Sequence, residues 1–267
     1  MIRIGPAGWS YADWEQTVYP LRLPKSAQLG FIAQSFPTIE INSSFYRVPS
    51  PTMAEGWCAK VAAFPDFKFT LKAYQGWTHE GTMDAVDVDR MKACLDILAG
   101  HGRLGLLLFQ FPYSFKPGPA AFDRLDQLHA ALHPWPCGVE VRHRDFNSDE
   151  FFDFLRERSL GFANIDQPSL SGNLGPTCVR TAPTAYVRLH GRNAEKWFSH
   201  GETWERYNYL YSREELVPWA DRIRTLAGDG EVYVILNNHY RGQALQNARN
   251  LQEMLEIPPP RQAFVLQ

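Results

Sequence analysis

Residues 39–46 read Ile-Glu-Ile-Asn-Ser-Ser-Phe-Tyr, and the first four alternate strictly between apolar and polar side chains. Successive side chains of a strand point to opposite faces, so the two isoleucines share one face while Glu40 and Asn42 share the other. Parallel strands that are packed between other layers are normally apolar on both faces. A carboxylate on the second face therefore predicts that this strand borders a polar interior.

Eight segments have the length and composition of strands, and a helical pattern follows most of them. The predicted strands span residues 2–5, 38–42, 67–73, 104–111, 138–142, 161–166, 185–191 and 231–238. The predicted helices begin after an N-cap at Ser26, near residues 52–63, 86–99 and 119–132, after an N-cap at Ser148, and over 213–227 and 243–255. Alternating strands and helices predict a parallel sheet, and eight such units predict an α/β fold of the TIM (β/α)8 barrel type, with a single domain over residues 1–267. A doubly wound open sheet is the alternative, but no G-x-G-x-x-G turn follows the first strand.

Two long segments interrupt the alternation of strands and helices, one after strand six and one after strand seven. Residues 167–183 are rich in Gly, Pro, Ser and Thr and have little helical period. Residues 192–212 carry two tryptophans and three tyrosines. Long connections inside a compact domain are usually functional, so we expect the second segment to act as a lid over the barrel.

The strands predicted over 67–73, 138–142, 161–166 and 185–191 repeat the alternation of residues 39–42. Their apolar faces are expected to contact the helices, because unpaired charge buried there would be costly. The polar faces are therefore expected to point into the barrel, toward the strand ends where TIM barrels place active sites. The last inward positions are Asn42, Lys72, Gln110, Arg142, Asp166, His190 and Asn237, and one layer deeper lie Glu40, Thr70, Glu140, Asn164 and Arg188.

This inward ring contains the residue types that acid–base catalysis needs, since carboxylates and imidazoles are common proton donors and acceptors. The candidate catalytic residues are Glu40, Glu140, Asp166 and His190. The candidate substrate-binding residues form three groups: cations that would hold an anionic group, amides that would orient hydroxyl groups, and aromatic or histidine side chains near the mouth. The cations are Lys72, Arg142 and Arg188, the amides are Asn42, Gln110 and Asn237, and the remaining side chains are Trp9, Tyr11, Tyr46 and His79. Which carboxylate is the acid and which the base stays open.

A structural charge network is the alternative, in which three carboxylates pair with three cations. Buried ion pairs often contribute little net stability relative to an apolar core, which favours a binding or catalytic site. A divalent metal held by the carboxylates and His190 is a further alternative, although no tight metal-ligand spacing supports it and no metal ligand is assigned. The chain has no nucleotide-cofactor motif.

Composition and charge limit the classes of function. With 267 residues, 45% hydrophobic and 21% charged, the chain is typical of a globular protein with a large core. The formal net charge of −2 argues against a strongly basic nucleic-acid-binding protein. The four cysteines form no C-x-x-C pair, and the chain shows neither a signal-peptide pattern nor a membrane-length apolar run. We expect a cytoplasmic protein without a membrane partner; the oligomeric state is not indicated.

Several motifs occur in a fixed order along nearly the whole chain. They are GWSY at 8–11, IEINSSFYRVPS at 39–50, Lys72 with Thr78 and His79, residues 107–112, EVRH at 140–143, YVRLHG at 186–191, and residues 237–248. With these motifs the chain resembles the YecE-like domain-of-unknown-function family of bacteria and archaea. The resemblance implies a TIM barrel and no established reaction. The chain departs from the family pattern at residues 5–8, which lack the usual small hydroxyl residue, and at Arg144–Phe146, where Ser-Trp is commoner.

Three classes of function fit these observations. The leading hypothesis is an enzyme of the hydrolase, isomerase or lyase type that acts on a small polar anionic molecule, such as a sugar phosphate or nucleotide derivative. The second is a metal-dependent barrel that processes or binds nucleic acid, which is an analogy at the level of the fold. The third is a protein that binds a metabolite without catalysis.

Overall fold

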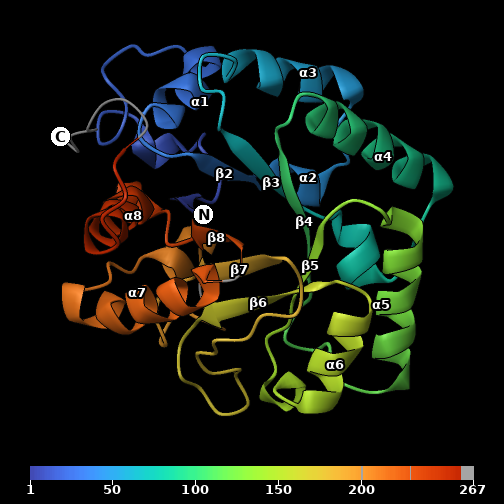
Figure 1. The fold of residues 1–267 in the computed structure, drawn as a ribbon. Coiled ribbons are helices and arrows are strands. Elements are labelled where there is room, and N and C mark those ends of the chain that lie inside the picture. The colour runs from blue at the N-terminus through green and yellow to red at the C-terminus, as the bar shows by residue number, and fades with distance from the viewer. Residues whose placement is uncertain (200, 229, 260–267) are drawn as a thin grey trace.

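The computed structural model describes residues 1–199, 201–228 and 230–259, and within them eight parallel strands form one sheet in the order β1-β8-β7-β6-β5-β4-β3-β2 (Figure 1). The strands are β1 Ile2–Pro6, β2 Thr38–Ile41, β3 Lys68–Lys72, β4 Leu104–Gln110, β5 Cys137–Glu140, β6 Gly161–Asp166, β7 Thr184–Leu189 and β8 Glu231–Leu236. The helices are α1 Lys25–Ala33, α2 Ser43–Tyr46, α3 Pro51–Lys60, α4 Ala85–Gly100, α5 Pro119–Leu132, α6 Asp149–Glu157, α7 Arg213–Ala227 and α8 Gln243–Met254. The longer helices lie on the outside of the sheet, whereas α2 follows the end of β2. The fold is a single-domain TIM-type barrel, as the sequence predicts.

The barrel closes between the first two strands through a short contact. Ala7 bridges Glu40, and the Gly8 amide donates to the Glu40 carbonyl oxygen at 2.8 Å. Gly5 makes this approach feasible, because a Cβ there would lie 1.9 Å from the carbonyl oxygen of Thr38. The closure holds Glu40 against the first strand and so fixes one wall of the interior.

All eight predicted strands are confirmed, with ends that move by a residue or two. The N-cap at Ser148 is confirmed, since its hydroxyl oxygen accepts from the Phe151 amide. The N-cap predicted at Ser26 is wrong: helix α1 begins at Lys25 and Pro24 occupies the cap position, where its φ is already fixed. The sequence also gave no indication of α2, whose Ser44 hydroxyl lies 2.7 Å from the Lys72 carbonyl oxygen and ties the ends of β2 and β3 together.

The two predicted long connections are confirmed. Residues 167–183 join β6 to β7 without a helix, and residues 192–212 reach α7 through a single 3₁₀ turn at Thr203–Tyr207. In the described part of the chain, no helix is both long enough and apolar enough to cross a membrane.

Candidate functional site

A cavity of about 380 Å³ opens where the strands end. Lys72 is the last residue of β3 and Gln110 the last of β4, so the cavity lies at the C-terminal mouth of the barrel. Eight predicted substrate-binding residues line it: Tyr11, Asn42, Tyr46, Lys72, Gln110, Arg142, Arg188 and Asn237. The structure thus brings together side chains that are up to 226 residues apart in the sequence, Tyr11 and Asn237 being the extremes.

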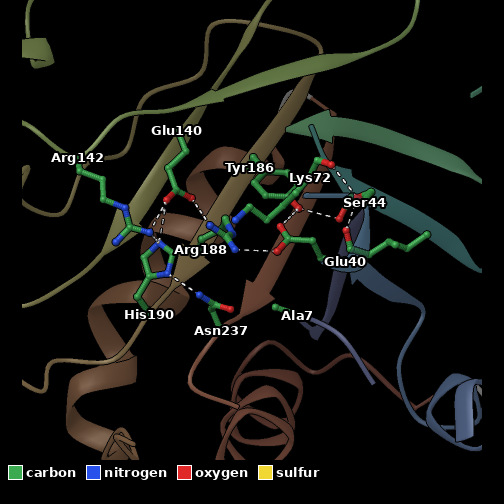
Figure 2. Close-up of polar contacts among 12 residues, drawn as sticks. Ala7, Glu40, Ser44, Lys72, Glu140, Arg142, Tyr186, Arg188, His190 and Asn237 are labelled. Atoms are coloured by element: carbon green, nitrogen blue, oxygen red, sulfur yellow. Dashed lines mark hydrogen bonds and ion pairs between the residues drawn. The ribbon is translucent and has the colours of Figure 1, made fainter. Parts of the chain in front are cut away.

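The floor of the cavity is an ion-pair network centred on Arg188 (Figure 2). Its Nη2 lies 2.7 Å from Oε1 of Glu40, and its Nη1 lies 2.5 Å from Oε2 of Glu140. The Tyr186 hydroxyl donates to the other oxygen of Glu40 at 2.9 Å and lies 2.7 Å from the hydroxyl of Thr70. Arg188 is 1% exposed and both carboxylates are fully buried, so the network is shielded from solvent.

The second oxygen of Glu140 receives two further groups. Arg142 Nη2 lies 2.9 Å from Oε1 of Glu140, and His190 Nε2 lies 3.2 Å from the same atom. The side-chain amide of Asn237 lies 3.0 Å from His190 Nδ1. With the amide nitrogen donating, Nδ1 is the acceptor and Nε2 carries the proton that Glu140 accepts. His190 is therefore assigned as the neutral Nε2–H tautomer.

The protonation states of this floor follow from burial and charge. Burial opposes ionisation of Glu140, but the guanidinium groups of Arg188 and Arg142 hold its pKa well below the usual range. Burial lowers the pKa of His190 to about 3, despite the neighbouring Glu140. Both groups keep one protonation state near neutral pH, which makes them poor partners for proton exchange with a substrate.

Lys72 behaves differently from the other cations of the floor. Its Nζ lies 3.8 Å from the centroid of the Phe45 ring, and among the described residues it has no hydrogen bond or ion pair. Burial lowers its pKa to about 7, and the positive charges of Arg188 and Arg142 act in the same direction. Lys72 is thus the one floor residue of the described chain whose pKa is placed near neutral pH.

The prediction that Asp166 points into the barrel is wrong. The β6–β7 register pairs Ile165 with Arg188 and Asp166 with Leu189, and paired residues of parallel strands point to the same face. Ile165 therefore borders the interior, whereas Asp166 faces the helices. Alternation gives the period of a strand but not which face is inward.

Asp166 instead anchors the long connections on the outer side of β6. Its carboxylate accepts from Trp219 Nε1 of α7 at 2.6 Å and from the Tyr211 hydroxyl at 2.9 Å, and it pairs with Arg192 at 2.7 Å. The side chain of Asn164 also points away from the barrel interior, and its amide nitrogen donates to the Val179 carbonyl oxygen. Neither residue contributes to the barrel mouth, and Asp166 is not retained as a candidate catalytic residue.

Two other predicted residues lie beside the cavity instead of lining it. Trp9 lines an adjoining hollow of about 260 Å³, which shares Tyr11, Asn42 and Tyr46 with the cavity. His79 packs against the ring of Phe45, with 4.9 Å between the ring centroids.

The rim of the cavity contains residues that the sequence did not single out as site residues. Asp13 follows β1, Glu202, Trp204 and Tyr207 belong to the 192–212 segment, and His239 follows β8. The aromatic density of the 192–212 segment was the only signal for Trp204 and Tyr207, and it did not say which rings reach the mouth; no pattern in the sequence indicated Glu202. The segment predicted as a lid therefore does lie over the cavity.

Among residues 1–199, 201–228 and 230–259, no group of three His, Cys, Asp or Glu side chains is placed to hold a metal ion. Both oxygens of Glu40 and Glu140 are occupied by donors, and Asp166 faces away from them. The floor of the cavity instead presents cations and amides, and the carboxylates of Asp13 and Glu202 lie at the rim.

The fold and the site define a TIM-barrel protein with a polar, cation-rich cavity at its C-terminal mouth. Residues 3–264 match the family described as "Protein of unknown function DUF72", and the chain belongs to that family. The match confirms the family relationship expected from the motifs; the relatives named below carry the labels DUF72 and UPF0759, not YecE-like.

Relatives of similar length support this membership. The chain is 30% identical to the UPF0759 protein YunF of Bacillus subtilis (strain 168), over 96% of this chain and 95% of that protein. It is 34% identical to the DUF72 family protein TM1631 of Thermotoga maritima MSB8, whose crystal structure superposes with a TM-score of 0.86 over 96% of this chain and 99% of that one. A DUF72 family protein of Enterococcus faecalis V583 shares the fold, with a TM-score of 0.83 and 23% identity over 99% of this chain and 100% of that one.

Proposed function

We propose that the protein is an enzyme that performs acid–base chemistry on a small, polar, anionic molecule, such as a sugar phosphate or nucleotide derivative, in the cavity at the barrel mouth. Arg142 and Arg188 hold the anionic group, the amides orient hydroxyl groups, and Lys72 exchanges the proton. Isomerase, lyase and hydrolase chemistry all fit this arrangement.

The observation that carries the proposal is the unequal number of charges around the floor. With Asp166 outside, two carboxylates face three cations, instead of the three against three that a self-neutralising network would need. Arg188 and Tyr186 occupy the two oxygens of Glu40, and Arg188 and Arg142 occupy those of Glu140. Lys72 is left without a carboxylate partner among the described residues. A surplus cation beside a cavity supports the binding of an anion.

Buried polar atoms without partners support a ligand of matching polarity. Among the described residues, the Oδ1 of Asn42 and the Nε of Arg188 are buried without a hydrogen-bond partner, and both residues line the cavity. Such atoms are rare in folded proteins because each costs about 1–3 kcal/mol. A hydroxyl or amine donor on the ligand matches Asn42, and an oxygen acceptor matches Arg188.

The proposal changes the roles expected from the sequence. Glu40, Glu140 and His190 lie beneath the cavity and position Arg142 and Arg188, whereas Lys72 has a pKa of about 7 and lines the cavity. A general base works best when its pKa lies near the operating pH. Lys72 therefore takes the proton-transfer role first given to the carboxylates.

The rim favours a small ligand over a nucleic acid. Asp13 and Glu202 line the entrance, and carboxylates there repel a polyanion that must extend past them. The cavity of about 380 Å³ falls in the range of small-molecule sites.

Calorimetric titration tests the binding half of the proposal, with ribose 5-phosphate and unphosphorylated ribose as a matched pair. We expect binding of the phosphate ester only, and about tenfold weaker binding in Arg142→Gln, because a charge-assisted contact contributes about 1.5–3 kcal/mol. Arg144→Gln is the matched control, since Arg144 lies two residues further and is exposed. Equal binding of ribose and its phosphate ester, or equal loss in both variants, contradicts the proposal.

Proton NMR of a panel of sugar phosphates and nucleotides in D2O tests the chemical half. A proton abstracted by the enzyme exchanges with solvent deuterium, so the signal of the affected C–H group disappears or new product signals arise. Binding without any exchange or product across the panel favours the non-catalytic alternative. Salt-sensitive binding of oligonucleotides, with no binding of the small phosphates, favours the nucleic-acid alternative.

A further inference from the structure

The ε-amino group of Lys72 is placed as a reactive group and not as a structural cation. The side chain lines the cavity and runs from the end of β3 toward Arg188 (Figure 2). Its nitrogen lies over the ring face of Phe45, at 3.8 Å from the centroid, and no polar atom of the described residues is within bonding distance. The lone pair of the neutral amine is therefore not engaged by the protein.

Lys68, a second lysine of the same strand, has a structural role and serves as a comparison. Lys68 lies four residues earlier on β3, on the same strand face but at the opposite end of the barrel. Its Nζ donates to the Gly102 carbonyl oxygen at 2.7 Å. Lys68 is thus held by the fold, whereas Lys72 has only an aromatic face beneath it and a cavity beside it.

The surroundings of Lys72 make the neutral amine accessible near pH 7. Burial and the neighbouring guanidinium groups disfavour the ammonium form and lower its pKa to about 7. Desolvation and adjacent cationic groups are the two known ways of activating a lysine as a nucleophile. The same guanidinium groups would hold the anionic end of a substrate next to the amine.

We propose that Lys72 forms an imine with a carbonyl carbon of the substrate, which narrows the substrate class to small anionic aldehydes and ketones. The inference rests on the proposed function for the anion site, and it replaces the proton-transfer role of Lys72 by a covalent one.

The step balances with groups that the cavity and solvent provide. The lone pair of Nζ attacks the carbonyl carbon, the π electrons move to oxygen, and the proton lost from nitrogen passes to that oxygen. The resulting carbinolamine takes one proton from solvent and expels water, which leaves a C=N bond with a protonated nitrogen. The iminium withdraws electrons from the adjacent carbon, so a neighbouring C–H or C–C bond breaks more readily. This is the chemistry of an isomerase or lyase.

Reductive trapping of the wild-type protein tests the inference without relying on its unknown activity. Glyoxylate, a carboxylate with an aldehyde, is added with cyanoborohydride at pH 7, and peptide mass spectrometry locates the carboxymethyl group fixed on lysine. We expect Lys72 to be labelled about tenfold or more faster than Lys68, because far more of its amine is neutral at that pH. Excess sulfate is expected to suppress labelling at Lys72 and leave Lys68 unchanged.

The outcomes separate this inference from the proposed function. Labelling of Lys72 that is no faster than that of Lys68 overturns imine formation, even if sulfate binds normally and the anion site stands. Absence of sulfate binding overturns the anion site, and the imine proposal with it. Lys72→Arg, which keeps the charge, is expected to keep sulfate binding within about threefold and to lose the labelled peptide. A variant that instead loses sulfate binding while remaining folded shows that Lys72 is an anion ligand only, and overturns the inference.

Discussion

Two buried carboxylate–arginine clusters at the ends of neighbouring strands look alike in the sequence and differ in the structure. The inner cluster joins Glu140, Arg188 and His190 beneath the barrel mouth, and the outer cluster joins Asp166 and Arg192 between β6 and α7. Each carboxylate is fully buried. The inner cations Arg142 and Arg188 are buried and line the cavity, whereas Arg192 is one-third exposed and has a second partner, Glu215.

This difference shows that a buried charge is informative only together with its surroundings. The outer cluster binds two neutral donors, Trp219 and Tyr211, and so fastens a loop and a helix to the sheet. The inner cluster supports Arg142 and lies beside Lys72, which has no ion-pair partner in the described part of the chain, and both cations line the cavity. The outer cluster is thus a structural anchor, whereas the inner cluster has the arrangement expected of side chains that support a binding site.

The largest expected difference between the clusters is in stability. Glu140→Ala leaves Arg188 and Arg142 short of a buried counterion, and we expect it to lower the free energy of unfolding by about 3–5 kcal/mol. Asp166→Ala is expected to cost about 1–3 kcal/mol, because Arg192 turns to solvent and Glu215 while only neutral donors lose their partner. Urea denaturation measures both values. An equal or larger cost for Asp166→Ala contradicts the comparison.

Sulfate binding is expected to depend on the inner cluster and not on the outer one. Asp166→Asn keeps the anion site intact, so sulfate affinity should stay within about threefold of the wild type. The same substitution weakens the bond to Arg192 and should increase amide hydrogen exchange in the 192–212 segment. Arg142→Gln should reverse this pattern, with about tenfold weaker sulfate binding and unchanged exchange. Isothermal titration measures the sulfate affinity of both variants, and hydrogen-exchange mass spectrometry measures amide exchange in their 192–212 segments.

Proton linkage is a smaller effect with a defined sign. Lys72 has a pKa of about 7, below the ordinary lysine value, and sulfate favours its ammonium form. Sulfate binding should therefore take up a proton near pH 8, and its affinity should rise as the pH falls from about 8.5 to 6, to an extent of up to about tenfold. Titration in buffers of different ionisation enthalpy measures the uptake. Lys72→Arg, which stays charged over this range, is the control and should show none.

A further expected effect concerns acid stability. The pKa of His190 is lowered to about 3, so the unfolded state binds a proton that the folded state does not. The resulting stability is complete above the ordinary histidine pKa and is lost as the pH falls below it, at up to about 1.4 kcal/mol per pH unit. His190→Gln should reduce the slope of the free energy of unfolding against pH between about pH 6.5 and 5. The reduction corresponds to at most one proton. The decline persists in part, because His79 and His239 also have pKa values lowered to about 4.

The sequence was sufficient for the barrel because eight short strand-like segments recur along the chain, a helical pattern follows most of them, and five of them alternate between apolar and polar residues. It also placed Lys72, Arg142 and Asn237 at one mouth, since parallel strands end at the same edge. It failed for Asp166 because alternation alone gives no phase, and the donors Trp219 and Tyr211 lie more than 40 residues away. The rim residues Glu202 and Trp204 were missed because loop conformation depends on tertiary contacts such as the stacking of Trp204 on Tyr240.

Crystals of the protein soaked in selenate give the most direct test of the central claim, that the inner cluster supports an anion site. Selenate has the shape and charge of sulfate, and its anomalous signal locates it without bias from the protein. An anomalous peak in the cavity, in contact with Arg142 and with Lys72 or Arg188, is the predicted result. Selenate bound elsewhere on the surface with an empty mouth, in crystals where no neighbouring molecule blocks the cavity, contradicts the account and returns the inner cluster to a structural role like that of Asp166.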